Sequence, residues 1–204
     1  MPAAPVELSW VIRQGRTFRY LVRPEALPLV YKPITAIAKS APVAITAPGH
    51  GLVSGWSAAI TNVGGMTELN ATANSLKSTD FKQVTFVDAN TVTINSIDSS
   101  GFSTYTSGGH LVYYTPVSMA GAEVRLDLRD RVGGVLLYQM SSALGNIVID
   151  DTNHMITLTI PATDSAGFTF VSAVGDLEIE YSDGVVEELL HVEVEVHREL
   201  TTSA

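Results

Sequence analysis

Apolar and polar residues alternate along much of the chain, as they do in β-strands that bury one face. The alternation is clearest over residues 122–129, 155–160 and 175–181. Gly, Pro, Asn and Asp residues separate such stretches and favour turns. The pattern predicts strands at residues 6–12, 17–23, 34–37, 43–46, 57–61, 84–87, 91–94, 110–114, 122–129, 135–138, 147–149, 155–160, 175–181 and 187–197. A single helical turn is expected, either at residues 141–144 or at residues 161–165.

The strand at residues 17–23 has no evident partner beside it in the sequence. The strand at residues 122–129 is expected to supply that partner after a long interruption. Pro24, Pro28 and Pro33 predict an extended connector after the earlier strand, because proline cannot donate a hydrogen bond to a strand ladder. The chain therefore leaves one β domain near Pro33 and returns to it much later.

The interruption, residues 34–116, contains five or six short strands with turn residues between them, which favours a small barrel. Residues 1–33 and 117–204 together supply seven or eight strands, enough for an immunoglobulin-like sandwich. We therefore predict an all-β fold, in which an immunoglobulin-like antiparallel sandwich carries a small β-barrel inserted in one loop. The sandwich is discontinuous in the sequence, and the barrel is continuous.

The composition agrees with a globular protein. Of 204 residues, 46% are hydrophobic and 16% are charged, so a core can form. The chain has no cysteine, which excludes disulfides and thiolate metal sites. Residues 1–5 lack the basic and apolar segments of a leader, so we expect no signal peptide. No apolar run approaches the roughly 20 residues of a membrane span, so no membrane span is expected.

The charge is unevenly distributed. The net charge is -9, yet residues 1–33 hold five basic and two acidic residues, whereas residues 117–204 hold four basic and fifteen acidic residues. An acidic body argues against a nucleic-acid partner, because phosphate binding needs a basic surface. The asymmetry predicts that the basic N-terminal edge of one copy meets the acidic face of the next. The candidate subunit contacts are Trp10, Arg19, Arg23, Glu178, Glu180, Glu193 and Glu195.

A candidate metal site lies in the last predicted strand, where His191, Glu193, Glu195 and His197 share one face. A His and Glu pair can chelate Zn²⁺ from such a face. The set spans about 20 Å at about 3.3 Å per residue, so at most two neighbours reach one ion. Because no third ligand is identifiable, a solvated or subunit-facing surface is preferred, and no metal or other cofactor is predicted.

Catalytic chemistry is also not predicted. Asp150 and Asp151 form a carboxylate pair, but they precede a strand in an Asp-Asp-Thr-Asn run that is ordinary turn chemistry. His50 lies between two glycines, where its imidazole is expected to cap the local backbone. Since a nucleophile, a base and an orienting group cannot be assembled, we expect no catalytic residue and no enzyme activity.

Aromatic side chains offer a different function. Trp56, Tyr105 and Tyr113 lie in the predicted insert and are candidates for an exposed face that binds a host-surface glycan. Sugar binding by β-sandwich proteins gives precedent for this alternative. Core packing or subunit contact is the competing interpretation of the same residues. An exposed aromatic cluster on the insert would favour glycan binding.

The insert resembles a small barrel found in tail and other virion proteins of bacteriophages. That barrel is itself named for its likeness to the first catalytic-cysteine half-domain of ubiquitin-activating enzymes. The ubiquitin label does not transfer, because this chain has no cysteine to form a thioester. The matching residues are His50-Gly51-Leu52, Gly55, Ile60, Val63, Gly65-Met66-Thr67-Glu68-Leu69-Asn70, Asp88-Ala89-Asn90-Thr91 and residues 101–109.

The flanking halves resemble the immunoglobulin-like N-terminal domain of phage baseplate proteins. The matching segments are residues 15–18, 124–129, 156–158, 175–181 and 192–196. Together the two resemblances imply a non-enzymatic structural protein of a bacteriophage virion, in the tail, baseplate or neck. They also imply synthesis in the host cytoplasm and contacts with copies of itself and with other virion proteins. A capsid decoration or head-fibre protein is a further alternative.

Overall fold

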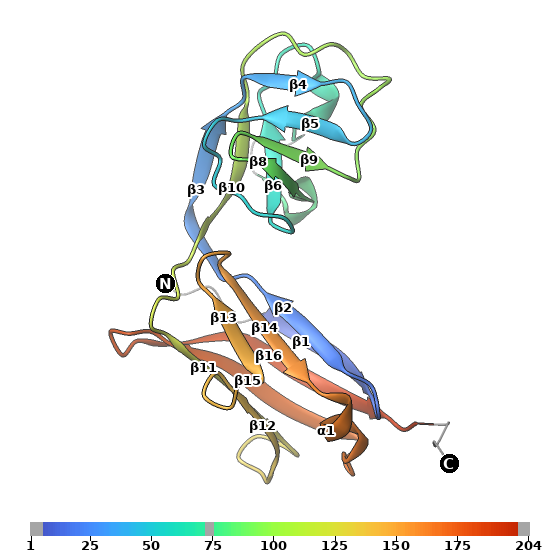
Figure 1. The fold of residues 1–204 in the computed structure, drawn as a ribbon, viewed down its shortest axis with the longest axis vertical. Helices are drawn as coiled ribbons and strands as arrows, with labels where there is room; N and C mark the ends of the chain where they lie inside the picture. The colour runs from blue at the N-terminus through green and yellow to red at the C-terminus, as the bar shows by residue number, and fades with distance from the viewer. Residues whose placement is uncertain (1–5, 72–75, 200–204) are drawn as a thin grey trace. The chain divides into compact units, whose positions relative to one another are not determined.

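The computed structural model describes residues 6–71 and 76–199, and Figure 1 shows its strands. Residues 1–5, where no signal peptide was expected, lie outside this range. The described residues form two compact units. Unit 1 combines the residues up to Pro24 with those from Val117 onward, and unit 2 is Glu25–Pro116. The all-β class that the alternation predicts is confirmed, with one short α-helix among the described residues.

Unit 1 is a sandwich of two sheets. The larger sheet has five strands, β1-β16-β15-β11-β12 in spatial order. Strand β1 lies at the edge of this sheet and, among the described residues, pairs only with β16. That pair is parallel, whereas every other pair in this sheet is antiparallel. The strands of the five-stranded sheet are β1 (Val6–Arg13), β11 (Glu123–Arg129), β12 (Leu136–Ser141), β15 (Ser172–Glu180) and β16 (Val186–His197).

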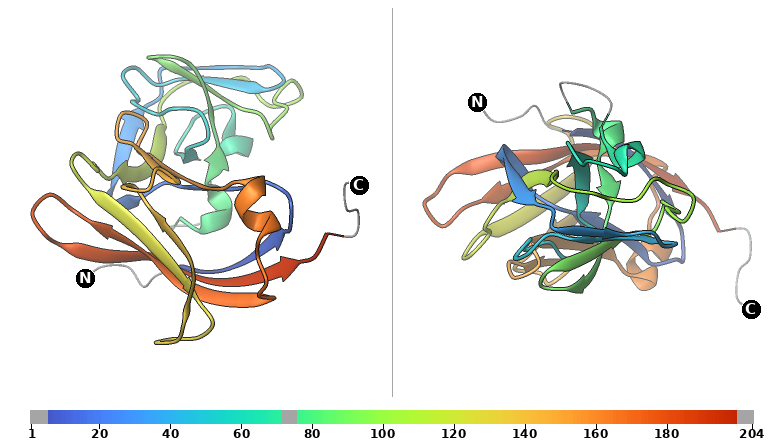
Figure 2. Two further views of the ribbon diagram at one scale, coloured as in Figure 1. Left: turned by 60° about the horizontal axis from the view of Figure 1, so that its bottom comes forward. Right: turned by 90° about the horizontal axis from the view of Figure 1, so that it is seen from above.

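The smaller sheet of unit 1 has the order β13-β14-β2 and lies over the larger one (Figure 1 and Figure 2). The expected pairing of the second strand with residues 122–129 is wrong, because β2 pairs with β14 instead. Both edges of β11 are already occupied, by β12 and β15. The strands of the three-stranded sheet are β2 (Phe18–Val22), β13 (Ile147–Asp150) and β14 (Met155–Ile160).

Aromatic packing joins the two sheets of unit 1. The Trp10 ring on β1 lies 5.1 Å from the rings of both Phe18 and Tyr20 on β2, measured between centroids. Trp10 is 4% exposed, so it belongs to the sandwich core. Leu126 and Leu158 are fully buried in the same core, one from each sheet. This inter-sheet contact requires β2 to lie across from the five-stranded sheet and not beside it.

The predicted helical turn is found at the second of its two expected places. Helix α1 (Ala162–Ala166) follows strand β14. Its buried Ser165 donates a hydrogen bond from Oγ to the carbonyl of Arg16, 2.9 Å away, and so ties the helix to the turn before β2. Residues 142–145 form a turn without a helix.

Unit 2 contains two four-stranded sheets around one core. Their orders are β3-β10-β6-β7 and β4-β5-β9-β8. Among the described residues their ladders are separate, so closure into a barrel stays a prediction. Two short 3₁₀ helices, η1 (Thr67–Leu69) and η2 (Ser78–Asp80), connect the strands. The strands are β3 (Glu25–Pro33), β4 (Ala36–Ala38), β5 (Val43–Thr46), β6 (Ser57–Thr61), β7 (Lys82–Gln83), β8 (Thr85–Asp88), β9 (Thr91–Ile94) and β10 (His110–Pro116).

The connector predicted from the prolines is wrong, because residues 25–33 form strand β3. It pairs antiparallel with β10 and lies at the edge of its sheet, where a proline without an N–H is tolerated. The register shifts opposite Leu27 and Pro28, and the Thr115 hydroxyl donates a hydrogen bond to the Pro28 carbonyl there. Unit 2 therefore starts at Glu25 and not at residue 34.

The two points at which the chain passes between the units, after Pro24 and before Val117, are adjacent in the structure. The backbone N–H of Val117 donates to the carbonyl of Pro24 at 3.1 Å. This bond joins the last residue before unit 2 to the first residue after it. The chain therefore leaves unit 1 and returns to it at nearly the same point, as an insertion in a loop requires.

Candidate functional site

The outward surface of the five-stranded sheet carries most of the charged groups of unit 1. Along β15 and β16 the apolar residues point into the sandwich, and the polar residues point away from it. We call this outward surface the acidic face, since nine acidic residues share it with only three arginines. The acidic members are Glu7, Glu123, Asp127, Asp176, Glu178, Glu180, Glu188, Glu193 and Glu195, and the arginines are Arg13, Arg125 and Arg129.

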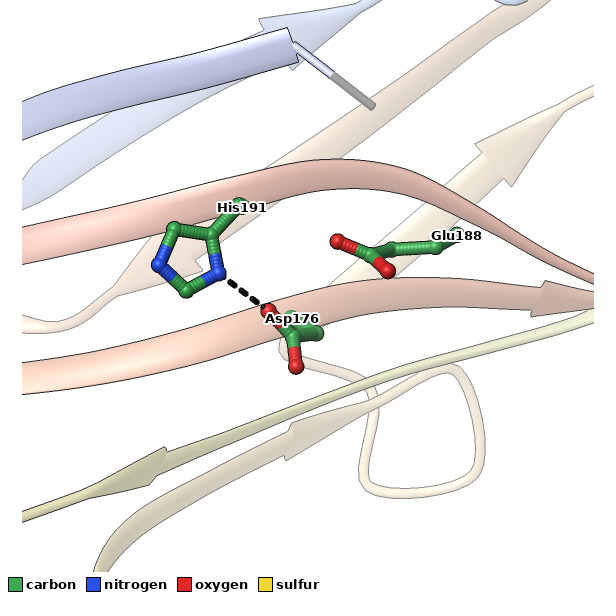
Figure 3. Close-up of side chains that lie close together, drawn as sticks. All are labelled: Asp176, Glu188 and His191. Carbon is green, nitrogen blue, oxygen red and sulfur yellow. Dashed lines mark hydrogen bonds and ion pairs between the residues drawn. The ribbon is translucent and has the colours of Figure 1, made fainter. Parts of the chain in front are cut away.

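One imidazole and two carboxylate side chains lie close together on the acidic face, as Figure 3 shows. His191 on β16 lies directly opposite Asp176 on β15 in the ladder. The His191 Nδ1–H donates to Asp176 Oδ1 at 2.5 Å. The Glu188 carboxylate lies beside them, and the three ligand atoms are all within 4.8 Å of one another.

A β-bulge explains why Glu188 joins this cluster. The register between β15 and β16 shifts between Leu177, which faces Leu190, and Glu178, which faces Glu188. Leu189 is the extra residue, and it packs against the core beside Leu190. Without the bulge, residues 188 and 191 would point to opposite sides of the sheet, because they are an odd number of positions apart.

The electrostatics of the cluster favour a cation at this point. The hydrogen bond that His191 donates to Asp176 raises the pKa of His191, and the negative charges of Asp176, Glu188 and Glu7 raise it further. The Glu188 carboxylate accepts no hydrogen bond from any of residues 6–71 and 76–199. The His191 imidazole therefore forms a hydrogen bond with the carboxylate of Asp176 but not with that of Glu188.

His191 also separates two open depressions of the acidic face. One, of about 270 Å³, is lined by residues that include Arg129, Val132 and Asp176. The other, of about 310 Å³, is lined by Glu7, Leu8, Ser9, His191 and Glu193. Solvent and small solutes therefore reach His191 from both sides.

The four candidate metal ligands on the last predicted strand do not gather at one point. The structure confirms that they all point away from the core, but His197 pairs with Glu195 at 2.9 Å, away from His191. Asp176 and Glu188 are the neighbours of His191 that the sequence interpretation missed. The signal for Glu188 is the adjacent pair Leu189-Leu190, which breaks the alternation of β16.

Several of the predicted subunit contacts are already engaged within the chain. Trp10 is buried between the sheets, so the expectation that it anchors a neighbouring subunit is wrong. Arg125 Nε and an Nη bind Glu178 and Glu180 at 2.8 and 3.1 Å. These exposed ion pairs reduce the number of free carboxylates on β15. On β16, Glu193 and Glu195 remain exposed.

The predicted basic contacts lie on the other side of the sandwich. Arg19 is exposed on β2, where its neighbours Phe18 and Tyr20 point into the core. Arg23 follows β2, and its guanidinium lies 3.9 Å from the Met155 sulfur. The three-stranded sheet thus presents Arg19 on its outward surface, opposite to the acidic face, whereas Arg23 is half-buried.

Two of the three aromatic residues proposed for glycan binding are not exposed. Trp56 is 1% exposed and Tyr113 is 4% exposed, and both belong to the core of unit 2. Tyr113 lies on the central strand β10, and Trp56 directly precedes the other central strand, β6. Tyr105 is half-buried, and its hydroxyl lies 3.0 Å from the carbonyl oxygens of Ile34 and Gly108. The expectation of an exposed aromatic face is therefore wrong for Trp56 and Tyr113.

His50 has the capping role that the sequence predicts. Its Nδ1 accepts a hydrogen bond from the Leu52 N–H at 2.9 Å, and its Nε2 lies 2.9 Å from the Asp88 carbonyl. These partners require a neutral imidazole with its proton on Nε2. The buried ring therefore fastens the turn before Leu52 to the end of β8 and has no lone pair left for catalysis.

The Gly-Met-Thr-Glu-Leu-Asn run also has a structural role. Asn70 accepts from the Val63 N–H and donates to the Val63 carbonyl, at 2.8 and 3.1 Å. The Glu68 carboxylate accepts from the N–H and the hydroxyl of Ser103. A depression of about 270 Å³ beside this run is lined partly by Glu68 and Asn70, whose polar groups are used in these bonds.

The paired aspartates form a turn, as the sequence predicts. Asp150 accepts from the N–H and the side-chain amide of Asn153, which lowers the pKa of Asp150. Asp151 instead accepts from the Met119 N–H and the Ser118 hydroxyl. The two carboxylates accept hydrogen bonds from different segments of the chain, so they do not form a paired acid–base site.

Comparison with known proteins adds no relative. No family model matches the chain, and no curated protein matches it significantly. Helices among the described residues are too short to cross a membrane. The interpretation of the chain therefore rests on its own residues and on the resemblances described above.

Proposed function

We propose that this chain is a non-enzymatic structural component of a bacteriophage virion, where copies of it assemble side by side in the tail, baseplate or neck. The observation that carries the proposal is the separation of charge across unit 1. The acidic face covers one sheet, whereas exposed Arg19 lies on the outward side of the other and Arg16 is exposed in the turn before it. The two resemblances described above support the same assignment.

Opposite charge on opposite surfaces favours a head-to-tail contact between copies. Such a contact joins two different surfaces of the same chain, so it can repeat and close into a ring. Exposed charge pairs are screened beyond about 8 Å at physiological salt. The charges would therefore steer the approach of two copies, and the holding contacts would be apolar. Exposed Leu21 on β2, between Arg19 and Arg23, is available for that role.

The charge contact predicts an assembly defect after charge reversal. We expect Arg16→Glu combined with Arg19→Glu to leave the chain folded, because both side chains are exposed. Incorporation into particles should fall at least about tenfold, since like charges would then face each other across the contact. Arg23 is left unchanged because its guanidinium packs on Met155. Quantitative immunoblotting of purified virions measures the incorporation.

A matched control makes the same change of charge elsewhere. Lys39→Glu with Lys77→Glu also reverses two exposed basic residues, but neither lies on β2 or in the turn before it. This control should be incorporated at the wild-type level. Equal incorporation of both double variants would exclude the β2 surface as an assembly contact. Absence of the wild-type chain from purified particles would overturn the virion assignment itself.

Glycan binding and a decoration or head-fibre role are not supported by a specific observation. The burial of Trp56 and Tyr113 removes the exposed aromatic face on which glycan binding depended. Loss of glycan binding in Trp56→Ala would no longer identify a binding residue, because that substitution also removes core packing. A glycan array with the intact wild-type chain is the informative test.

A further inference from the structure

We propose that Asp176, Glu188 and His191 form a binding site for one divalent ion of the zinc class on the acidic face. The proposal is independent of the virion assignment, because it rests on the geometry of β15 and β16 alone. One imidazole nitrogen and two carboxylate oxygens supply the ligands. This donor set is common for Zn²⁺, which binds imidazole and carboxylate groups.

The spacing of the three groups fits such an ion after small side-chain rotations. Ligand atoms around a four-coordinate zinc ion lie about 3.3 Å apart, because each bond is about 2.0–2.2 Å long. His191 Nδ1 and Asp176 Oδ1 are 2.5 Å apart, and the third ligand atom lies within 4.8 Å of both. The ion would take the place of the proton that His191 and Asp176 now share. Glu188 would then turn toward it.

The backbone of the site is rigid, and its surroundings attract cations. Two ligands are direct partners in an antiparallel ladder, and a β-bulge fixes the third on the same surface. The acidic face holds nine carboxylates and three arginines, so it raises the local concentration of cations. The depressions on both sides of His191 give an ion an open approach. Three protein ligands leave a fourth position for water or for a group of a neighbouring molecule.

The choice of metal follows from the imidazole. Ca²⁺ takes six to eight oxygen ligands and Mg²⁺ keeps most of its water, so neither gains much from a histidine nitrogen. Zn²⁺ binds imidazole readily. The site should therefore discriminate between Zn²⁺ and Ca²⁺, whereas a merely acidic surface attracts both by charge alone.

Titration calorimetry of the untagged full chain with Zn²⁺ tests the proposal. We expect one saturable site per chain and at least about tenfold tighter binding of Zn²⁺ than of Ca²⁺. Asp176→Asn, Glu188→Gln and His191→Ala should each weaken Zn²⁺ binding at least about tenfold, because each removes one ligand. All three side chains are on the surface, and unfolding curves without metal check that each variant is folded.

Two control variants distinguish this site from diffuse charge attraction and from binding at His197. Glu193→Gln removes one negative charge from a neighbouring outward position of β16, and His197→Ala removes the histidine that pairs with Glu195. Both should bind Zn²⁺ within about threefold of the wild type, because neither residue supplies one of the three ligands. Equal weakening by Glu193→Gln and Glu188→Gln, or equal binding of Ca²⁺ and Zn²⁺, would reduce the site to diffuse charge attraction. Absence of saturable binding in the wild type would also overturn it.

Discussion

Gly65→Ala is expected to destabilise unit 2 severely. Gly65 has φ +82°, and a Cβ there would lie 2.1 Å from the carbonyl oxygen of Thr104 and 2.8 Å from the N–H nitrogen of Thr106. An L-residue in the left-handed region costs about 1–2 kcal/mol, and forcing atoms into a packed site costs about 1–3 kcal/mol more. Both contacts are with backbone, so no side chain can rotate out of the way. The free energy of unfolding should fall by about 2–5 kcal/mol.

The physical reason lies in how two loops of unit 2 hold each other. The Gly64 N–H donates to the Ser107 carbonyl, and the Thr106 N–H donates to the Gly64 carbonyl. Glu68 accepts two further bonds from Ser103. A side chain at residue 65 would separate these segments and break several bonds together. The run that carries the resemblance to phage barrels is thus needed for the fold of unit 2.

Urea denaturation followed by NMR measures this effect in each unit separately. The chain has two tryptophans, and Trp10 is buried in unit 1 while Trp56 is buried in unit 2. In Gly65→Ala the indole N–H signal of Trp56 should disappear at lower urea, and that of Trp10 should not move. Gly101→Ala is the control, because no heavy atom lies within 4 Å of a Cβ there. Equal stability of the two variants would show that residues 65 and 104 are not in close contact.

Trp56→Ala should cost unit 2 about 3–5 kcal/mol, the usual range for a large aromatic side chain removed from a core. Trp56 is among the largest fully buried side chains, and its carbonyl accepts a 2.7 Å hydrogen bond from the Val84 N–H. Small domains are stable by only about 5–15 kcal/mol, so the loss is a large fraction of the total. Differential scanning calorimetry should show the transition of unit 2 at a clearly lower temperature.

The control for this substitution is an aromatic residue on the surface of the same unit. Tyr31 is 56% exposed, and its ring touches only the edge of His110 at 6.1 Å. Tyr31→Ala should change the stability of unit 2 by about 0.5 kcal/mol or less. If Trp56→Ala kept the wild-type stability while a measured glycan affinity disappeared, Trp56 would be a surface residue and the packing described above would be wrong.

The strands could be predicted because their signal is local. Alternation located β5, β6, β9 and β14 at their observed bounds and most others within a few residues. Strand β3 was missed because three prolines near it argue against a strand, and only its pairing with β10 shows that it is an edge. The predicted partner of β2 was wrong for a similar reason. Which strands pair depends on long-range packing, here on the Trp10 contacts, that no local pattern encodes.

The candidate site was predicted only in part because two of its features are not local. The outward direction of His191 follows from alternation, but its partner Asp176 lies on another strand and follows from register. Counting back from the Ser182-Asp183-Gly184 turn gives the wrong register, because the bulge at Leu189 adds one residue. The burial of Trp56 and Tyr113 was equally difficult to predict. Alternation shows which side chains share a face of a strand, but it does not show whether other parts of the fold cover that face.

The parallel pairing of β1 with β16 has a mechanical consequence. The chain enters β1 at Val6 and leaves β16 at His197, which are opposite ends of a ladder of eight residue pairs. Tension between the two ends of the chain therefore pulls these strands along their length, and all the hydrogen bonds between them resist together. An antiparallel pair pulled from one end would open one bond at a time. In single-molecule stretching, the force that opens unit 1 should be higher when the load is applied at Val6 and His197 than when it is applied at Val6 and Val186.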